Sequence, residues 1–168
     1  MFYKEAYMKN ADVKKIDAVT YIRPCHLRFK KKFKEIMLEA LSESGFRYDP
    51  ILNYDLDHPE LVYRKKKGDF FIITHKRKIV GTFAIQDMGK GKAYWKRLAI
   101  LKEYRGNGWG VEAQKYLIDI SKRKGFRLAV IDTLKETGMY EKYQRFGFKI
   151  TKECPEGQFT KVFMEKRL

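Results

Sequence analysis

The sequence has few residues that could cross-link it, bind a metal or anchor it in a membrane. It contains two cysteines, Cys25 and Cys154, and three histidines in 168 residues. Two cysteines without metal-ligand spacing exclude a disulfide scaffold, so we expect a reducing, cytoplasmic setting and no metal site. No apolar run approaches the roughly 18 residues of a membrane span, so no membrane association is expected. Residues 1–15 are charged and lack the apolar core of a secretory signal.

Acidic residues are scarce relative to basic ones. The chain has 21 Asp and Glu against 37 Lys and Arg, a formal net charge of +16. Such a balance favours anionic partners, including nucleic acid and phosphorylated cofactors. The cations are nevertheless scattered, with only short clusters at residues 30–32, 64–67 and 76–78. Short clusters are typical of solvated faces and turns, which argues against nucleic acid as the main partner of this basic protein.

The hydrophobic pattern predicts one folded domain over residues 1–168. Hydrophobic residues make up 44% of the chain and aromatic residues 15%, which is typical of a globular protein. Alternating or continuous apolar runs predict strands, and apolar residues at helical intervals predict helices. Strands are expected at residues 16–23, 70–75, 79–85, 94–101, 127–133, 148–152 and 161–166. Helices are expected from Pro24 to about Gly45 and over residues 111–124 and 136–145, with a short helix around 59–64.

A glycine-rich run joins the strand at 94–101 to the helix at 111–124. It reads Tyr104-Arg105-Gly106-Asn107-Gly108-Trp109-Gly110. Glycines allow close approach of the backbone to a ligand and torsions that other residues avoid. The helix that follows contributes unpaired N–H groups and the positive end of its dipole. This combination predicts a site for a phosphate group, with Arg105 as an additional positive charge.

The glycine spacing separates this loop from the common nucleotide-binding motifs. A dinucleotide fingerprint would need a third glycine where Val111 stands, and no phosphate loop ending in Gly-Lys-Ser or Gly-Lys-Thr occurs. The remaining pattern, Arg-x-x-Gly-x-Gly over Arg105, Gly108 and Gly110, resembles the coenzyme A pyrophosphate loop of the GNAT superfamily of N-acetyltransferases. The alternative is a plain glycine-rich turn between a strand and a helix.

A second segment strengthens this resemblance. GNAT proteins commonly carry Tyr-x-x-x-Gly-Phe on the helix after their fifth strand, and Tyr143, Gly147 and Phe148 fit that pattern. The resemblance extends over about residues 19–168. It implies an α/β (α+β) GNAT fold, in which helices flank a mixed, mostly antiparallel twisted sheet of about six or seven strands. It also implies a V-shaped split between the fourth and fifth strands, here the strands at 94–101 and 127–133.

The resemblance implies acetyl-CoA as the acyl donor, bound as a cosubstrate in this split. Backbone groups of Leu98, Ala99 and Ile100 would pair with its pantetheine arm and polarise the acetyl carbonyl. The pyrophosphate would bind N–H groups along Arg105, Gly106, Asn107, Gly108, Trp109 and Gly110. The chain departs from the family at Trp109, which could pack beneath the loop or over the cofactor. It also lacks the asparagine that often follows the fifth strand.

Acetyl transfer to an amine needs a proton donor for the thiolate and a base for the amine. The resemblance assigns the donor role to Tyr143, with Tyr140 one turn earlier as the second choice; either could instead be a packed aromatic residue. No carboxylate lies on the strand at 94–101. The base could be water or one of four carboxylates: Asp87, Asp132, Glu136 and Glu141. The histidines His26, His58 and His75 have no partnered spacing, and we expect none to be catalytic.

The sequence predicts an N-acetyltransferase that transfers an acetyl group to a primary amine of a small molecule or protein, by direct attack in a ternary complex. The acceptor is not identified, although the poorly patterned region 46–69 offers Tyr48, Tyr54, Asp55 and Asp57 as candidate contacts. An acidic patch of Asp55, Asp57 and Glu60 could offset the positive charge locally. The alternative function is a non-catalytic GNAT-fold binding module with a basic surface for nucleic acid or another anion. A homodimer is a common assembly in the family.

Overall fold

The structure, a computed structural model, describes residues 12–168. Most of the segment examined for a secretory signal, residues 1–11, therefore lies outside the described part. The strands are β1 (Lys14–Lys15), β2 (Thr20–Pro24), β3 (Asp69–His75), β4 (Lys78–Asp87), β5 (Lys92–Ile100), β6 (Leu128–Leu134), β7 (Lys149–Glu156) and β8 (Phe159–Arg167). The α-helices are α1 (Lys30–Glu43), α2 (Tyr54–Asp57), α3 (Pro59–Tyr63), α4 (Trp109–Arg123) and α5 (Met139–Arg145). Short 3₁₀ turns cover Leu27–Phe29, Lys102–Tyr104 and Lys135–Thr137.

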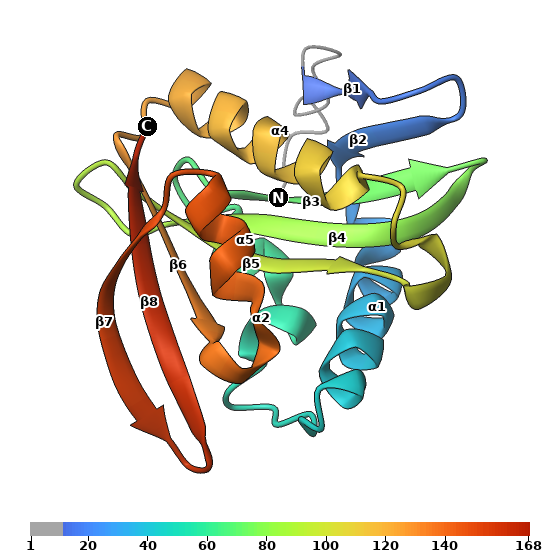
Figure 1. Cartoon of the computed structure of the whole chain (residues 1–168). Helices are drawn as coiled ribbons and strands as arrows, with labels where there is room; N and C mark the ends of the chain where they lie inside the picture. The colour runs from blue at the N-terminus through green and yellow to red at the C-terminus, as the bar shows by residue number, and fades with distance from the viewer. Residues whose placement is uncertain (1–11) are drawn as a thin grey trace.

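The strands form one eight-stranded sheet in the order β1-β2-β3-β4-β5-β6-β8-β7 (Figure 1). All neighbours are antiparallel except β5 and β6, which are parallel. A parallel neighbour requires a long crossover connection, and α4 provides it. The expected α/β fold with a mixed, mostly antiparallel sheet is confirmed. The extra strand beyond the expected six or seven is the two-residue β1, which pairs with β2 through Lys14 and Ile22.

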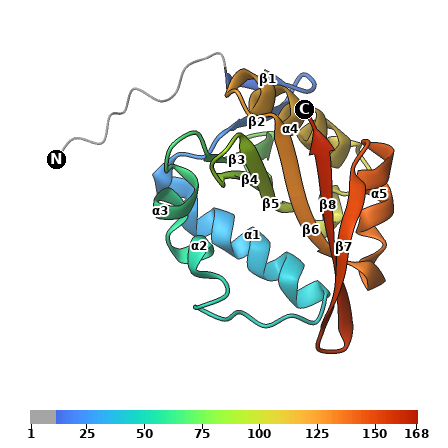
Figure 2. The same ribbon diagram turned by 90° about the vertical axis from the view of Figure 1, so that its left-hand side faces the viewer.

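Helices cover both faces of the sheet. Helices α1, α2 and α3 lie on one face and α4 and α5 on the other (Figure 2). The larger core lies between the sheet and α4, whose apolar side contributes Ala113, Leu117 and Ile120. The smaller core lies under α1, which contributes Phe33 and Ile36. Strand β5 contributes to both cores and β6 to the larger one, and the split described below lies between these strands.

Three local expectations differ from the structure. Pro24 does not begin a helix; it is the last residue of β2, because pairing with β3 continues past it and the Cys25 N–H donates to the Phe70 carbonyl at 2.8 Å. The helix expected at 136–145 is interrupted at Gly138, whose left-handed φ of 67° separates a 3₁₀ turn from α5. The closing strands extend further than expected, and only a tight turn at Gly157 separates β7 from β8.

Among the described residues, no helix combines the length and the apolar character that crossing a membrane requires.

Candidate active site

The glycine loop runs from the end of β5 to the first turn of α4. Gly106 and Gly108 have left-handed φ values of 84° and 76°, which favour glycine at both positions. Gly108 is the N-cap of α4 and provides no side-chain acceptor for the helix. The first intrahelical hydrogen bond runs from the Glu112 N–H to the Gly108 carbonyl at 3.1 Å. The preceding N–H groups of the helix are therefore available to an anion at its positive end.

Trp109 packs beneath this loop. Its side chain is 5% exposed and belongs to the larger core. The indole stacks on Tyr104 at 6.1 Å and lies against the His75 ring at 4.9 Å between ring centroids. Of the two roles that the sequence left open for Trp109, the structure shows packing under the loop. The side chain thus supports the loop, and any contact with a ligand falls to the Trp109 backbone N–H.

The Arg105 side chain has two protein partners. Its Nε donates to the Ile100 carbonyl at 2.7 Å, and its terminal nitrogens hold Glu43 of α1 at 2.6 and 3.0 Å. This bidentate pair lowers the pKa of Glu43, chiefly through its hydrogen bonds to Arg105. Arg105 was predicted to supply charge to a phosphate. In this structure its hydrogen bonds instead link the loop to the end of β5 and to α1.

The expected V-shaped split opens between β5 and β6. Their pairing covers only residues 92–94 of β5 and 128–130 of β6, although both strands continue beyond it. The register with β4 also shifts, so that Arg97 and Leu98 together oppose one residue of β4. Arg97 has a left-handed φ of 60°, and its carbonyl accepts from the Thr82 hydroxyl at 3.0 Å. This β-bulge re-aims the strand just where it leaves β6.

The same stretch of β5 contains the predicted pantetheine-binding residues. Leu101 donates its N–H to the Val80 carbonyl of the neighbouring strand at 2.9 Å. Because backbone groups alternate in direction along a strand, those of Leu98 and Ile100 point away from β4, toward the split. Those of Ala99, which pairs with Thr82, point toward β4. The structure therefore places two of the three predicted residues with their backbone facing the split.

Tyr143 lies on α5, which packs against β6 and the larger core. Its ring meets Phe148 edge-on at 5.6 Å between centroids. Burial raises the pKa of Tyr143 to about 12, and the negative charge of Asp132 adds to this rise. The hydroxyl therefore keeps its proton throughout the neutral range. Tyr140 is also half-buried against this core, but its hydroxyl donates to the exposed Glu141 at 3.3 Å.

Of the four carboxylates considered as a base, Asp132 lies on β6, one of the two strands that line the split. It accepts from the Tyr94 hydroxyl of β5 and lies 3.7 Å from the Lys161 ammonium. The other three have local roles or exposed positions. Asp87 accepts from the Gly89 N–H in a turn, Glu136 accepts from the Thr160 N–H, and Glu141 is exposed. Each of the three histidines has a side-chain or backbone partner within the fold.

A buried polar network on the α1 side of β5 was not predicted. Asp55 of α2 is 5% exposed and accepts from two Arg97 nitrogens, Nη2 at 2.6 Å and Nε at 2.7 Å. It also accepts from the Tyr63 hydroxyl and lies 4.0 Å from the Lys96 ammonium. Burial opposes ionisation of Asp55, but the Arg97 hydrogen bonds and charge outweigh it and hold the pKa of this carboxyl below its usual value. Because 42 residues separate Asp55 from Arg97, sequence spacing carried no signal of this pair.

The region expected to contact the acceptor is held together by internal pairs. Asp57 binds Lys34 and accepts from the Tyr48 hydroxyl, and Glu60 lies 3.4 Å from Lys30. With Asp55 bound to Arg97, each acid of the expected acidic patch is matched by a cation. These three acids therefore form no local excess of negative charge. Tyr54 is different, because its ring is 47% exposed and stacks on His58 at 4.6 Å.

Residues 31–148 match the model of the Acetyltransferase (GNAT) family, which covers more than half of the chain. The chain therefore belongs to the GNAT family of acetyltransferases. It is an acyltransferase, and its acyl donor is acetyl-CoA.

Solved structures of this family have the same fold. A GNAT acetyltransferase from Staphylococcus aureus Mu50 superposes with a TM-score of 0.78 at 20% identity, covering 88% of this chain and 98% of that one. An acetyltransferase from Streptococcus agalactiae 2603 gives 0.78 at 20% identity, covering 90% and 100%. YncA from Salmonella typhimurium, solved with its cofactor acetyl-CoA, gives 0.71 at 14% identity, covering 89% and 94%. No curated protein sequence matches this chain.

Proposed function

We propose that this protein transfers the acetyl group of acetyl-CoA to a primary amine of a small molecule or protein, by direct attack in a ternary complex. The observation that carries this proposal is the position of three features around one split. The edge of β5 faces it, the glycine loop begins at the end of the same strand, and Tyr143 lies on the helix that packs against β6. A non-catalytic binding module would not require these features together.

The proposed binding mode uses mainly backbone groups. The backbone of Leu98 and the N–H of Ile100, whose carbonyl accepts from Arg105, would pair with the pantetheine arm and polarise the acetyl carbonyl. An N–H group aimed at the developing oxyanion is typically worth about 3 kcal/mol. The N–H groups from Gly106 to Gly110 would bind the pyrophosphate. Titration calorimetry with acetyl-CoA and with free coenzyme A tests this step, and absence of binding at millimolar concentration would reject the proposal.

The proposed role of Tyr143 is to hydrogen-bond the sulfur as the carbon–sulfur bond breaks. After the protonated amine has lost a proton to water or a carboxylate, its nitrogen attacks the carbonyl carbon. The tetrahedral intermediate then loses a second proton from nitrogen to the same base and collapses, the carbon–sulfur bond breaks, and coenzyme A leaves as a thiolate. With a pKa of about 12, Tyr143 is a weaker acid than a thiol of pKa about 8.5. Complete proton transfer to the thiolate is therefore uphill by about 5 kcal/mol. Stabilisation of the developing negative charge, with the final proton coming from solvent, is the step that this side chain supports.

The Tyr143→Phe variant tests this role. Phenylalanine keeps the ring packing against Phe148 and removes only the hydroxyl. A hydrogen bond to a charged atom contributes about 1.5 to 3 kcal/mol, so kcat should fall roughly 10- to 100-fold with little change in the KM for acetyl-CoA. Tyr140→Phe is the matched control and should retain activity. The rate is measured as thiol release with a panel of amino acids, polyamines, aminoglycosides and peptide N-termini, which also identifies the acceptor. Equal rates for wild type and Tyr143→Phe would remove Tyr143 from the mechanism.

Homodimer formation and the cytoplasmic location stay predictions. So does the organisation of residues 1–168 as one domain. Size-exclusion chromatography with light scattering would establish the oligomeric state, and limited proteolysis would locate any domain boundary.

A further inference from the structure

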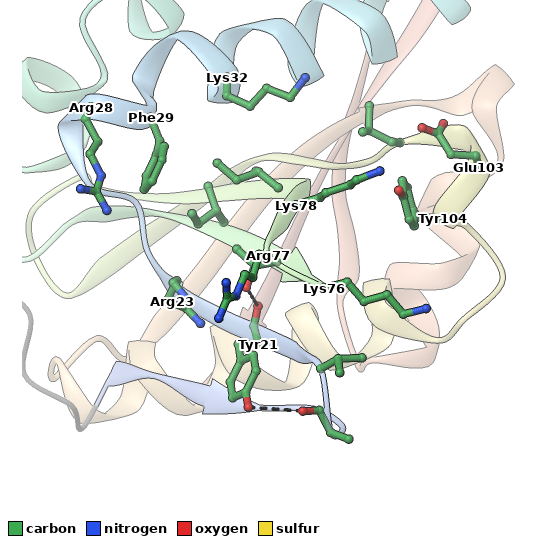
Figure 3. Close-up of a pocket in the computed structure, with 16 residues that line it drawn as sticks. Tyr21, Arg23, Arg28, Phe29, Lys32, Lys76, Arg77, Lys78, Glu103 and Tyr104 are labelled. Atoms are coloured by element: carbon green, nitrogen blue, oxygen red, sulfur yellow. Dashed lines mark hydrogen bonds between the residues drawn. The ribbon is translucent and has the colours of Figure 1, made fainter.

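A large groove lies on the α1 side of the sheet, away from the split. Helix α1 packs on β4 and β5 and α3 packs on β3 and β4, and the groove lies beside them over β2 and the C-terminal part of β3. The groove there has a volume of about 1210 Å³. Figure 3 shows its walls, which come from β2, the start of α1, the turn between β3 and β4, and the 3₁₀ turn that precedes the glycine loop. Because α1 lies between this groove and the split, the two are separate surfaces.

The groove is strongly basic. Six cationic side chains and one carboxylate, Glu103, line it. The cations are Arg23, Arg28, Lys32, Lys76, Arg77 and Lys78. Of these, only Lys32 has an ion-pair partner among residues 12–168, at 3.3 Å from Glu35. A concave surface with charges of one sign concentrates the electrostatic potential and attracts an anionic partner.

Two of the arginines are held in place by aromatic rings. The Arg23 guanidinium lies over Tyr21 at 5.3 Å and that of Arg28 over Phe29 at 4.6 Å. The Nε of Arg23 is buried, and it has no hydrogen-bond partner among the described residues. A buried donor without a partner is costly, so a ligand oxygen at this position would bring a specific gain. A guanidinium oriented in this way suits bidentate binding of a carboxylate or a phosphate.

The turn between β3 and β4 places further cations at the edge of the groove. Lys76 and Arg77 have left-handed φ values of 46° and 66°. Two-residue hairpin turns with this geometry favour Asn and Gly, because a larger side chain is strained there by about 1 kcal/mol or more per residue. Such strain is typically retained where the side chains serve a function. Here it holds consecutive cations beside the groove (Figure 3).

The apolar side chains at the floor of the groove and its aromatic rings indicate which class of anionic partner fits best. Apolar side chains form part of the lining, including Val19, which is 41% exposed, and the half-buried Ile79 and Leu101. A sugar–phosphate backbone would leave these apolar side chains uncovered. The arginines also occupy one face of the Tyr21 and Phe29 rings, which leaves less aromatic surface for stacked bases. A peptide that combines carboxylates with apolar side chains would match both the charge and the floor.

We propose that this basic groove docks an acidic, partly apolar peptide segment of another protein. Docking there does not depend on acetyl transfer, because the groove shares only Tyr104 with the glycine-rich run, and none of residues 105–110 or of the split lines it. The enzyme would thus have a partner-binding surface separate from the split. Salt bridges at the walls of the groove and apolar contacts at its floor would hold the peptide.

Fluorescence anisotropy tests the proposal with a labelled peptide in which glutamates alternate with leucines. The full chain should bind it at physiological ionic strength, and should bind the same peptide with lysine in place of glutamate at least about tenfold more weakly. The double variant Arg28→Glu/Lys78→Glu should weaken binding of the acidic peptide about tenfold or more. The matched control Lys149→Glu/Lys152→Glu changes the net charge equally on exposed β7, and its binding should stay within about twofold of wild type.

Three outcomes would overturn this proposal. Equal weakening by both double variants would show binding by net charge alone. Tighter binding of a uridine oligonucleotide that displaces the peptide would make the groove a nucleic-acid site. No binding of the acidic peptide by wild type would also reject it, provided that circular dichroism shows a folded protein. Thiol release with a small amine should be unchanged in the groove variant, so failure of docking is distinguishable from failure of the proposed acetyl transfer.

Discussion

Asp55 connects three elements on the α1 side of the sheet. Its carboxylate receives hydrogen bonds from Arg97 on β5 and from Tyr63 on α3, and Lys96 lies nearby. Arg97 is also the residue at which β5 bulges. The pair therefore stabilises the strand geometry that opens the split, in addition to linking α2 to the sheet. Removal of one partner would leave the other charge buried without compensation.

The Asp55→Asn variant should destabilise the fold at neutral pH by about 3 to 5 kcal/mol, because Arg97 loses its charged partner. Urea unfolding measures this change. The matched control Asp57→Asn removes a more exposed pair with Lys34 and should cost at most about 1 kcal/mol. Similar losses in the two variants would contradict a special role for the buried pair.

The same pair predicts a pH dependence. The folded protein lowers the pKa of Asp55 relative to the unfolded value of about 3.9. The resulting stability is present above pH of about 4 and is lost as the pH falls through the folded pKa. The difference in the free energy of unfolding between wild type and Asp55→Asn should therefore become smaller at acidic pH. A difference that stays constant from pH 7 to the acid limit of the folded state would show that ionisation of Asp55 is not its source.

The element on which cofactor binding depends is the loop at the start of α4. Gly110 differs from its neighbours Gly106 and Gly108, because its φ is not left-handed. A Cβ added there would meet only the Ile100 Cδ1, at an ordinary 3.7 Å. Alanine therefore fits the free protein, and a glycine at this position is better explained by close approach of a ligand to the backbone.

Gly110→Ala should consequently separate stability from binding. Alanine in a helix is more favourable than glycine by about 0.5 to 1 kcal/mol, so the melting temperature should rise by a few degrees. The affinity for acetyl-CoA should fall about tenfold, because the new methyl group obstructs the pyrophosphate. Val111→Ala, on the exposed side of the same helical turn, is the control and should leave the affinity nearly unchanged. An affinity equal to wild type in Gly110→Ala would argue against this binding mode.

The contact between Arg105 and Glu43 allows two roles for Arg105 to be distinguished. If the pair stabilises the conformation of the loop, Arg105→Gln and Glu43→Gln should each weaken acetyl-CoA binding by a similar factor, about two- to fivefold. The double variant should then be no weaker than either single variant, since both remove one interaction. We expect this result from the bidentate geometry. If Arg105 instead binds phosphate, Glu43→Gln should tighten acetyl-CoA binding while Arg105→Gln weakens it. Calorimetry would then show changes in affinity of opposite sign for the two variants.

At the scale of the whole molecule, the net charge of +16 should bias the choice of acceptor. The acids near the acceptor side are paired with cations, so no local acidic patch formed by Asp55, Asp57 and Glu60 counters this charge. Within whichever acceptor class the amine panel identifies, analogues with added negative charge should give a higher kcat/KM than analogues with added positive charge. The ratio of kcat/KM for the more negative analogue to kcat/KM for the more positive analogue should decrease as sodium chloride screens the electrostatic field of the protein. A preference for polyamines that is independent of salt would contradict this prediction.

Much of the fold could be predicted because its signals are local. The apolar runs of β3 and β4, the helical spacing in α1 and α4, and the long connection that makes β6 parallel all follow from short-range patterns. The element boundaries expected near Pro24 and Gly138 were wrong, because the local residue pattern does not determine them. Pairing with β3 decides where β2 ends, and a single left-handed torsion decides where α5 begins.

The sequence by itself determined the glycine loop, the Tyr143 segment and the order of elements that places the loop after β5 and Tyr143 on α5, which packs against β6. Each depends on residue type and spacing within a short segment, where backbone torsions and helix ends follow directly from the residues. Tertiary structure decided that Trp109 packs under the loop, that Arg105 pairs with Glu43, that Asp55 pairs with Arg97, and that the basic groove forms. These features join segments far apart in the chain, because strand register, the bulge in β5 and the path of α1 determine which side chains meet.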